Sequence, residues 1–166
     1  FDKPINAICS EYARVVTTCL GVADPDTSHI RALHKLGHLP LRVRGLDEGT
    51  MVPFRCPVMT IENTHDEFFW LTNYIETLMS CELWQPSTSA TIAREYQKLF
   101  TAYAVDTVGE AGFTPFQGHD FSMRGMGCLD ASTLSGMGHL TSFVGTDTIP
   151  AILAAVIVFV IGWIVG

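Results

Sequence analysis

The sequence predicts a mixed α/β fold of the α+β kind, in which helices alternate with short strands. Apolar residues recur at helical spacing over residues 5–20 and 87–105. Short apolar runs bounded by Gly or Pro occur at residues 39–43, 58–61 and 142–144. The chain has 166 residues, 48% of them hydrophobic, which suits one domain or part of one.

The first two elements are predicted to be helices. Residues 5–20 place five side chains on one face: Ile8, Tyr12, Val15, Val16 and Cys19. A second helix is predicted to run to Lys35 and to end at Gly37. Three residues in the preceding loop can cap it: Asp26, Thr27 and Ser28.

Strands are predicted next, at residues 39–43, 51–54 and 58–61. Pro53 and Pro57 place the last two at sheet edges or strand ends, because proline cannot donate to a strand ladder.

Two more helices are expected in the middle of the chain. Thr64-His-Asp-Glu67 has the form of a capping box, so a helix is predicted from there to about Leu83. Trp84-Gln-Pro86 is predicted to break it, and a further helix to span residues 87–105.

Aromatic and charged residues follow two predicted strands in the last third of the chain. Phe121 follows a short strand, Arg124 lies in a Gly-bounded turn, and Asp147 follows the strand at 142–144, with a helix at 130–137 between them. Ligands of α/β folds bind at the carboxyl ends of strands. A flat heteroaromatic ring can stack on Phe121, Arg124 can donate to its carbonyl, and Asp147 can accept from an amide NH₂. The pattern predicts recognition of a carboxamide ring.

Other interpretations of these residues stay open. An Arg124–Asp147 salt bridge can simply tie two loops together, and Phe121 alone is more often a core aromatic. His119 and Asp120 are adjacent on a strand and point to opposite faces, which is a poor arrangement for relaying a proton.

Composition and motifs exclude several classes of protein. A net charge of −7 argues against nucleic-acid binding. Five cysteines without a Cys-x-x-Cys motif indicate free thiols in a reducing cytosol, and hence a cytoplasmic location. His34 and His38 lack the further ligands of a zinc site. Gly125-Met-Gly127 and Gly136-Met-Gly138 each fail to complete a dinucleotide-binding fingerprint.

The last eighteen residues, 149–166, contain no charged or strongly polar side chain. A run of this length is a candidate membrane span. A buried helix, a membrane anchor and the product of a reading-frame slip all remain open as explanations. The chain begins with Phe1 rather than Met, so we expect it to be a piece of a longer protein.

Several short motifs occur in order along the chain. The N-terminal ones are Gly37–Leu41, Val52–Pro53, Thr60–Thr64 and Trp70–Thr77. The C-terminal ones are His119–Gly125, Gly138–Leu140 and Phe143–Thr148. Together they resemble the motifs of nicotinamide phosphoribosyltransferases, which are type II phosphoribosyltransferases of NAD salvage. The resemblance runs from about Leu36 to Ile152.

The resemblance implies a partial N-terminal α+β domain over residues 1–117 and the start of the family's α/β barrel over 118–152, with an apolar tail of uncertain origin at 153–166. It also implies nicotinamide and phosphoribosyl pyrophosphate as substrates, with Mg²⁺, giving nicotinamide mononucleotide and pyrophosphate. A homodimer is implied as well.

The same resemblance assigns roles to three residues. Phe121 would stack on the nicotinamide ring, Arg124 would sit beside it, and Asp147 would accept from the carboxamide nitrogen. The family's phosphate-binding motifs and catalytic His and Asp lie beyond the end of this chain, so the isolated chain is expected to be inactive. A nicotinate phosphoribosyltransferase and a non-catalytic, membrane-tethered remnant are the alternatives.

Overall fold

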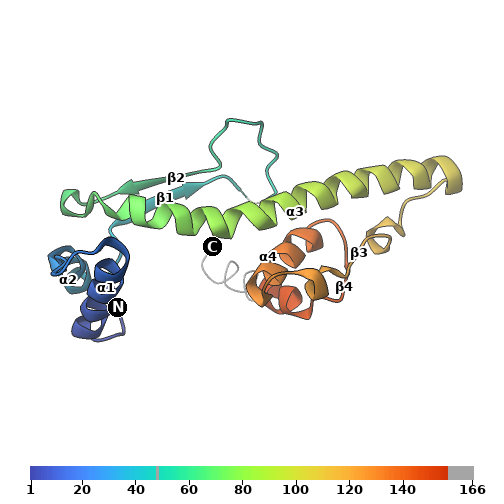
Figure 1. The fold of residues 1–166 in the computed structure, drawn as a ribbon. Coiled ribbons are helices and arrows are strands. Elements are labelled where there is room, and N and C mark those ends of the chain that lie inside the picture. Colours follow the sequence, from blue (N-terminus) through green and yellow to red (C-terminus); the bar gives the residue numbers. More distant parts are fainter. Residues whose placement is uncertain (48, 157–166) are drawn as a thin grey trace. The chain divides into compact units, whose positions relative to one another are not determined.

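The structure is a computed structural model that describes residues 1–47 and 49–156. It divides into two compact units, Phe1–Ile75 and Glu76–Gly166. Helices and short strands alternate along the chain (Figure 1), which confirms the predicted mixed class. The predicted domain boundary after residue 117 stays a prediction.

The first unit begins with two helices, α1 (Ile5–Leu20) and α2 (Ser28–Leu36), as predicted. Both end at a glycine in the left-handed conformation, Gly21 with φ 70° and Gly37 with φ 78°. Of the three predicted capping residues, Asp26 caps α2, because its Oδ1 accepts the N–H of Ser28, the first residue of the helix, at 2.8 Å.

An antiparallel pair of strands follows, β1 (Leu41–Gly45) and β2 (Met59–Asn63). Both lie about two residues later than predicted. The strand predicted at 51–54 is wrong, since that segment is a loop and turn. Pro53 has no N–H to give to a ladder, and its carbonyl instead accepts the Cys56 N–H in a turn.

The long helix α3 (Leu71–Val108) corrects two predictions. The capping box does not start it, because the Thr64 N–H donates to the Pro40 carbonyl at 2.8 Å and extends the strand pairing. Pro86 lies inside the helix instead of ending it. An internal proline costs about 3 kcal/mol, and we attribute its acceptance to the long helical runs on both sides.

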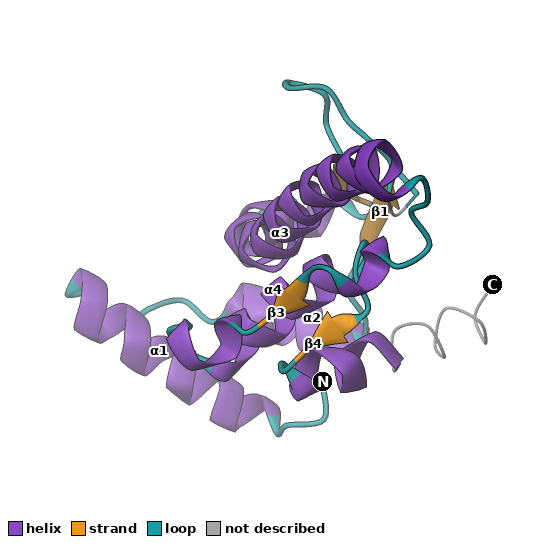
Figure 2. Cartoon of the chain, turned by 90° about the vertical axis from the view of Figure 1, so that its right-hand side faces the viewer, coloured by secondary structure: helices purple, strands orange, loops and turns teal. Residues whose placement is uncertain are grey.

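The second unit places a helix between two parallel strands. β3 (His119–Asp120) pairs with β4 (Gly145–Thr146), and α4 (Leu129–Leu140) connects them. Figure 2 shows these two strands as short arrows. β4 lies just beyond the predicted strand at 142–144, and β3 ends immediately before Phe121 as predicted.

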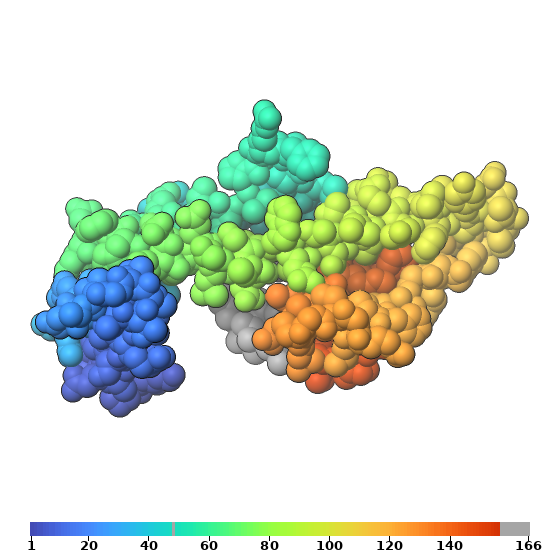
Figure 3. Space-filling view, viewed as in Figure 1, coloured from blue at the N-terminus to red at the C-terminus, as the bar shows by residue number. Residues whose placement is uncertain are grey.

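Small residues bring α4 close to α3. A Cβ added to Gly138 would lie 2.8 Å from Ser89 Cβ and would also meet the Pro86 carbonyl. Ser89 Oγ and Ser135 Oγ are 3.0 Å apart, and the Gln97 side chain donates to the Ser142 carbonyl at 2.6 Å. Figure 3 shows this part of α3, coloured green to yellow, beside the orange residues of α4. The packing of α4 against α3 therefore holds α4 in place ahead of β4, the strand that follows it in the chain.

Part of the predicted apolar tail is described. Residues 149–156 are helical, and Ala151 is fully buried. The rest of the tail, residues 157–166, lies outside the described residues. Among the residues that are described, no helix has the length and apolar character needed to cross a membrane.

Candidate functional site

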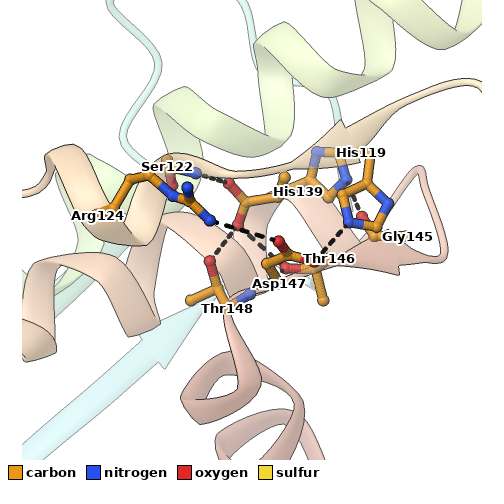
Figure 4. A network of polar contacts seen from close by, with 9 residues as sticks. His119, Ser122, Arg124, His139, Gly145, Thr146, Asp147 and Thr148 are labelled. Atoms are coloured by element: carbon orange, nitrogen blue, oxygen red, sulfur yellow. Dashed lines mark hydrogen bonds and ion pairs between the residues drawn. The ribbon is translucent and has the colours of Figure 1, made fainter.

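The ends of β3 and β4 carry the residues that the sequence singled out. Phe121 follows β3 directly, and Asp147 follows β4. Because the strands are parallel, both residues leave the sheet at the same edge. The Asp147 N–H donates to the Asp120 carbonyl at 2.8 Å, which joins the two strand ends. Figure 4 shows the side chains of His119 and Arg124 directed at Asp147.

His119 links two of the predicted residues. Its Nε2 lies 2.9 Å from Asp147 Oδ1. Its ring lies against the ring of Phe121, with centroids 4.3 Å apart and planes tilted by 34°. The sequence indicates His119 only as a neighbour of Asp120, whereas the structure pairs it with Asp147. Nothing in the sequence indicates this contact, because it depends on the register of β3 with β4.

Arg124 lies in the 3₁₀ turn Ser122–Gly125, with its guanidinium at the same carboxylate. Its Nη2 is 3.8 Å from Asp147 Oδ2, which is too long for a hydrogen bond. Its side chain is 81% exposed. A pair this loose and exposed contributes little to stability, so Arg124 keeps donors free for a ligand.

Phe121 is not a core residue in the described structure. It is 56% exposed, whereas the nearby Phe143 is 3% exposed and belongs to the core. An exposed aromatic ring beside charged groups can present a face to a planar ligand.

Asp120 is the buried carboxylate beneath this edge. Its Oδ2 accepts from the hydroxyls of Thr148 at 2.8 Å and Thr146 at 3.2 Å, and its Oδ1 accepts the Ser122 N–H at 2.9 Å. Burial, the largest influence, raises the pKa of Asp120, but the Ser122 hydroxyl and N–H and the two threonine hydroxyls together hold it below 3.8. The buried Ser122 Oγ has no hydrogen bond of good geometry. The backbone N–H of Ser122 is therefore the stronger of its two contacts with Asp120.

Two glycines allow the close packing behind the site. A Cβ added to Gly145 would lie 2.6 Å from His119 Nδ1, so only glycine leaves room for the imidazole. A Cβ added to Gly136 would lie 2.6 Å from the Ala151 Cβ and 3.2 Å from Asp120 Oδ2. The two glycines therefore leave room for His119 and Asp120 in their observed positions.

A pocket of about 350 Å³ lies beside the strand ends, between α3 and α4. Its walls include the rings of Tyr96, Phe100 and Phe143, and the polar side chains of His119 and His139. None of the three predicted site residues is part of its lining. We therefore place the candidate site at the exposed strand ends rather than in this pocket.

Metal ligands are a separate question. Over residues 1–47 and 49–156, no group of three His, Cys, Asp or Glu side chains is placed to hold a metal ion. Asp120 is engaged by hydroxyls and an N–H, and Asp147 by His119 and Arg124. The carboxylates at the strand ends do not fit a Mg²⁺ site by themselves.

Comparison with known proteins identifies the family. A protein of Acinetobacter baylyi named nicotinamide phosphoribosyltransferase is 51% identical over 152 residues, which is 92% of this chain and 30% of that protein. Proteins of the same name from Xanthomonas campestris and Mycoplasma genitalium are 39% and 38% identical, over 72% and 77% of the chain. The chain is a member of the nicotinamide phosphoribosyltransferase family. No family model matches the sequence.

The match to the nicotinamide phosphoribosyltransferases includes the candidate site. A match of 152 residues in 166 leaves at most 14 outside it, so residues 119–148 must lie within. The chain spans about a third or less of the length of these relatives, namely 30%, 25% and 30%. The candidate site therefore lies in a chain that corresponds to only a part of these relatives.

Proposed function

We propose that this chain supplies the nicotinamide-binding part of a nicotinamide phosphoribosyltransferase. The complete reaction transfers a phosphoribosyl group from phosphoribosyl pyrophosphate to nicotinamide, and releases pyrophosphate. One observation carries the proposal: Phe121 and Asp147 lie at the same edge of the β3–β4 pair, with the Asp147 carboxylate held by His119 at 2.9 Å.

Phe121 is the stacking surface for the pyridine ring. Its ring packs against His119 yet remains 56% exposed. Stacking restricts a flat ring to a plane but does not fix its rotation within that plane. The carboxamide group of nicotinamide therefore needs polar partners to set its direction.

Asp147 and Arg124 are those partners. The Asp147 carboxylate can accept from the amide NH₂, and the Arg124 guanidinium can donate to the amide oxygen. Nicotinic acid has a carboxylate in place of the amide, so it would face Asp147 with like charge and leave the acceptor unpaired. This arrangement favours nicotinamide over nicotinic acid.

The orientation of the ring is what this site contributes to chemistry. Transfer requires the ring nitrogen to be in line with the anomeric carbon, where an oxocarbenium-like centre develops. We assign phosphate binding and proton transfer to parts of the enzyme outside residues 1–156. Mg²⁺ would accompany the pyrophosphate group.

A homodimer and a cytoplasmic location complete the proposal. The homodimer is implied by the family resemblance alone, and the cytoplasmic location by the five cysteines, all of which are free. Free thiols persist in reducing compartments.

The proposal is tested in a chimera in which residues 1–152 replace the matching segment of the Acinetobacter baylyi relative. We expect formation of nicotinamide mononucleotide. Phe121→Ala should raise KM for nicotinamide by about five- to tenfold, because stacking contributes roughly 1–1.5 kcal/mol. Phe116→Ala is the matched control, because Phe116 is 73% exposed in the same unit and lies outside the site.

Two results would contradict the proposal. One is a chimera that folds but makes the nicotinic acid product in preference. The other is an equal effect of the Phe121 and Phe116 substitutions on KM. The isolated 166-residue chain is expected to show no turnover, since it lacks the family's phosphate-binding motifs.

A further inference from the structure

We infer that Asp120 is a positioning residue, whose single carboxylate holds both the Phe121 ring and the Asp147 carboxylate at the edge where nicotinamide is recognised. It deepens the function proposed above and rests on it. Asp120 does not itself reach the ligand side of the site, since it is 8% exposed.

On the β4 side, Asp120 accepts hydrogen bonds from the two residues next to Asp147 in the chain. Its Oδ2 accepts from Thr146 Oγ1 at 3.2 Å and from Thr148 Oγ1 at 2.8 Å. Its backbone carbonyl accepts the Asp147 N–H at 2.8 Å. Asp147 thus has a fixed backbone on both sides, while its own side chain stays 47% exposed.

On the β3 side, the same carboxylate holds the segment that carries Phe121. Its Oδ1 accepts the Ser122 N–H at 2.9 Å. Phe121 therefore lies between Asp120 and a residue hydrogen-bonded to it, which limits how far its backbone can turn. The two oxygens of Asp120 therefore serve different strand ends.

A carboxylate is the side chain that suits this task. All three groups that approach it are donors, and an ionised carboxylate accepts without having to donate. An amide of the same shape would turn its NH₂ either toward the Ser122 N–H, where two donors would meet, or toward the threonine hydroxyls, which would have to accept instead of donate. In both cases the amide also loses the charge that strengthens these hydrogen bonds, so the hold on one strand end would weaken.

The role is therefore geometric, and its loss should affect recognition more than the chemical step. Displacement of a substrate-positioning group by as little as 1 Å can cost orders of magnitude in rate. A substitution at Asp120 should raise KM for nicotinamide and reduce the preference for nicotinamide over nicotinic acid. A purely structural role would lower the amount of folded enzyme without changing this preference.

The test uses Asp120→Asn in the chimera described above. We expect KM for nicotinamide to rise by about tenfold, with a smaller change in kcat and a reduced nicotinamide preference. Ser132→Ala is the matched control. Ser132 is 1% exposed in α4 and its hydroxyl donates to the Cys128 carbonyl at 2.9 Å, so this variant loses a buried hydrogen bond away from the strand ends. It should keep the preference.

Thr148→Val and Thr148→Ser keep the proposal testable if Asp120→Asn does not fold. Valine has the shape of threonine without its hydroxyl, whereas serine keeps the hydroxyl. We expect the valine variant alone to lose part of the nicotinamide preference. Equal preferences in these two variants, or in Asp120→Asn and the unsubstituted chimera, would overturn the role of Asp120.

The two proposals fail differently. An unsubstituted chimera that folds and does not prefer nicotinamide would overturn the proposed function and this inference with it. A chimera that prefers nicotinamide, and keeps that preference in Asp120→Asn, would overturn only the role of Asp120.

Discussion

His119 Nε2 lies 2.9 Å from Asp147 Oδ1. This contact joins the first residue of β3 to the residue that follows β4. The imidazole also packs on Phe121, so one side chain touches two of the three proposed ligand contacts. Donation from His119 holds one carboxylate oxygen and leaves Oδ2 toward Arg124.

Replacement of His119 should therefore weaken amide recognition. His119→Phe keeps a ring against Phe121 but removes the donor, whereas His119→Gln keeps a donor and loses the ring. A hydrogen bond of this kind contributes about 1 kcal/mol, so we expect the nicotinamide preference to fall by roughly fivefold in His119→Phe. The measurement is kcat/KM for both substrates. A smaller loss in His119→Phe than in His119→Gln would contradict the assigned donor role.

The buried Asp120 should make stability depend on pH in the acid range. Its pKa is lowered in the folded chain, so it contributes stability that is present above its unfolded pKa, near 3.8, and is lost as pH falls through the folded value. We expect the free energy of unfolding to fall below about pH 4. In Asp120→Asn this part of the decline should be absent. Parallel stability curves between pH 3 and pH 6 would refute the prediction.

The contact between α4 and α3 should tolerate no side chain at Gly138. A Cβ there would meet the Pro86 carbonyl, Ser89 Cβ at 2.8 Å and Ala90 N at 2.9 Å. Overpacking of this kind costs about 1–3 kcal/mol, so Gly138→Ala should lower the melting temperature by several degrees. At Gly125 a Cβ would meet nothing within 4 Å, so Gly125→Ala is the matched control. Equal melting temperatures in the two variants would contradict the prediction, because they would show that the α3–α4 contact has room for a side chain at Gly138.

The helices were predictable where local signals agree. Helical spacing identified α1, and the capping residues before α2 together with Gly37 after it identified α2 to within about one residue at its end. The predicted break at Pro86 was wrong because the proline rule considers only the residues next to the proline. The long helical runs on both sides of Pro86 and the packing of α4 against it also act on this position. The predicted strand at 51–54 was wrong for a similar reason, since strand pairing depends on a distant partner.

The grouping of Phe121, Arg124 and Asp147 followed from their places after two strands. Their roles as nicotinamide contacts remain predictions, although the structure brings Arg124 and Asp147 within 3.8 Å. The contacts of His119 and Asp120 could not be read from the sequence. They depend on the register of β3 with β4, which pairs residues 26 positions apart, such as His119 with Gly145.

The most direct test of the account is the substrate preference of Asp147→Ser in the chimera. Serine removes the negative charge that would face the carboxylate of nicotinic acid. Asp106→Ser, which removes an exposed carboxylate on α3, is the control. We predict that the ratio of kcat/KM for nicotinamide to that for nicotinic acid falls by about tenfold or more in Asp147→Ser and stays the same in Asp106→Ser. An unchanged ratio in Asp147→Ser would contradict the assignment of Asp147 as the residue that recognises the amide.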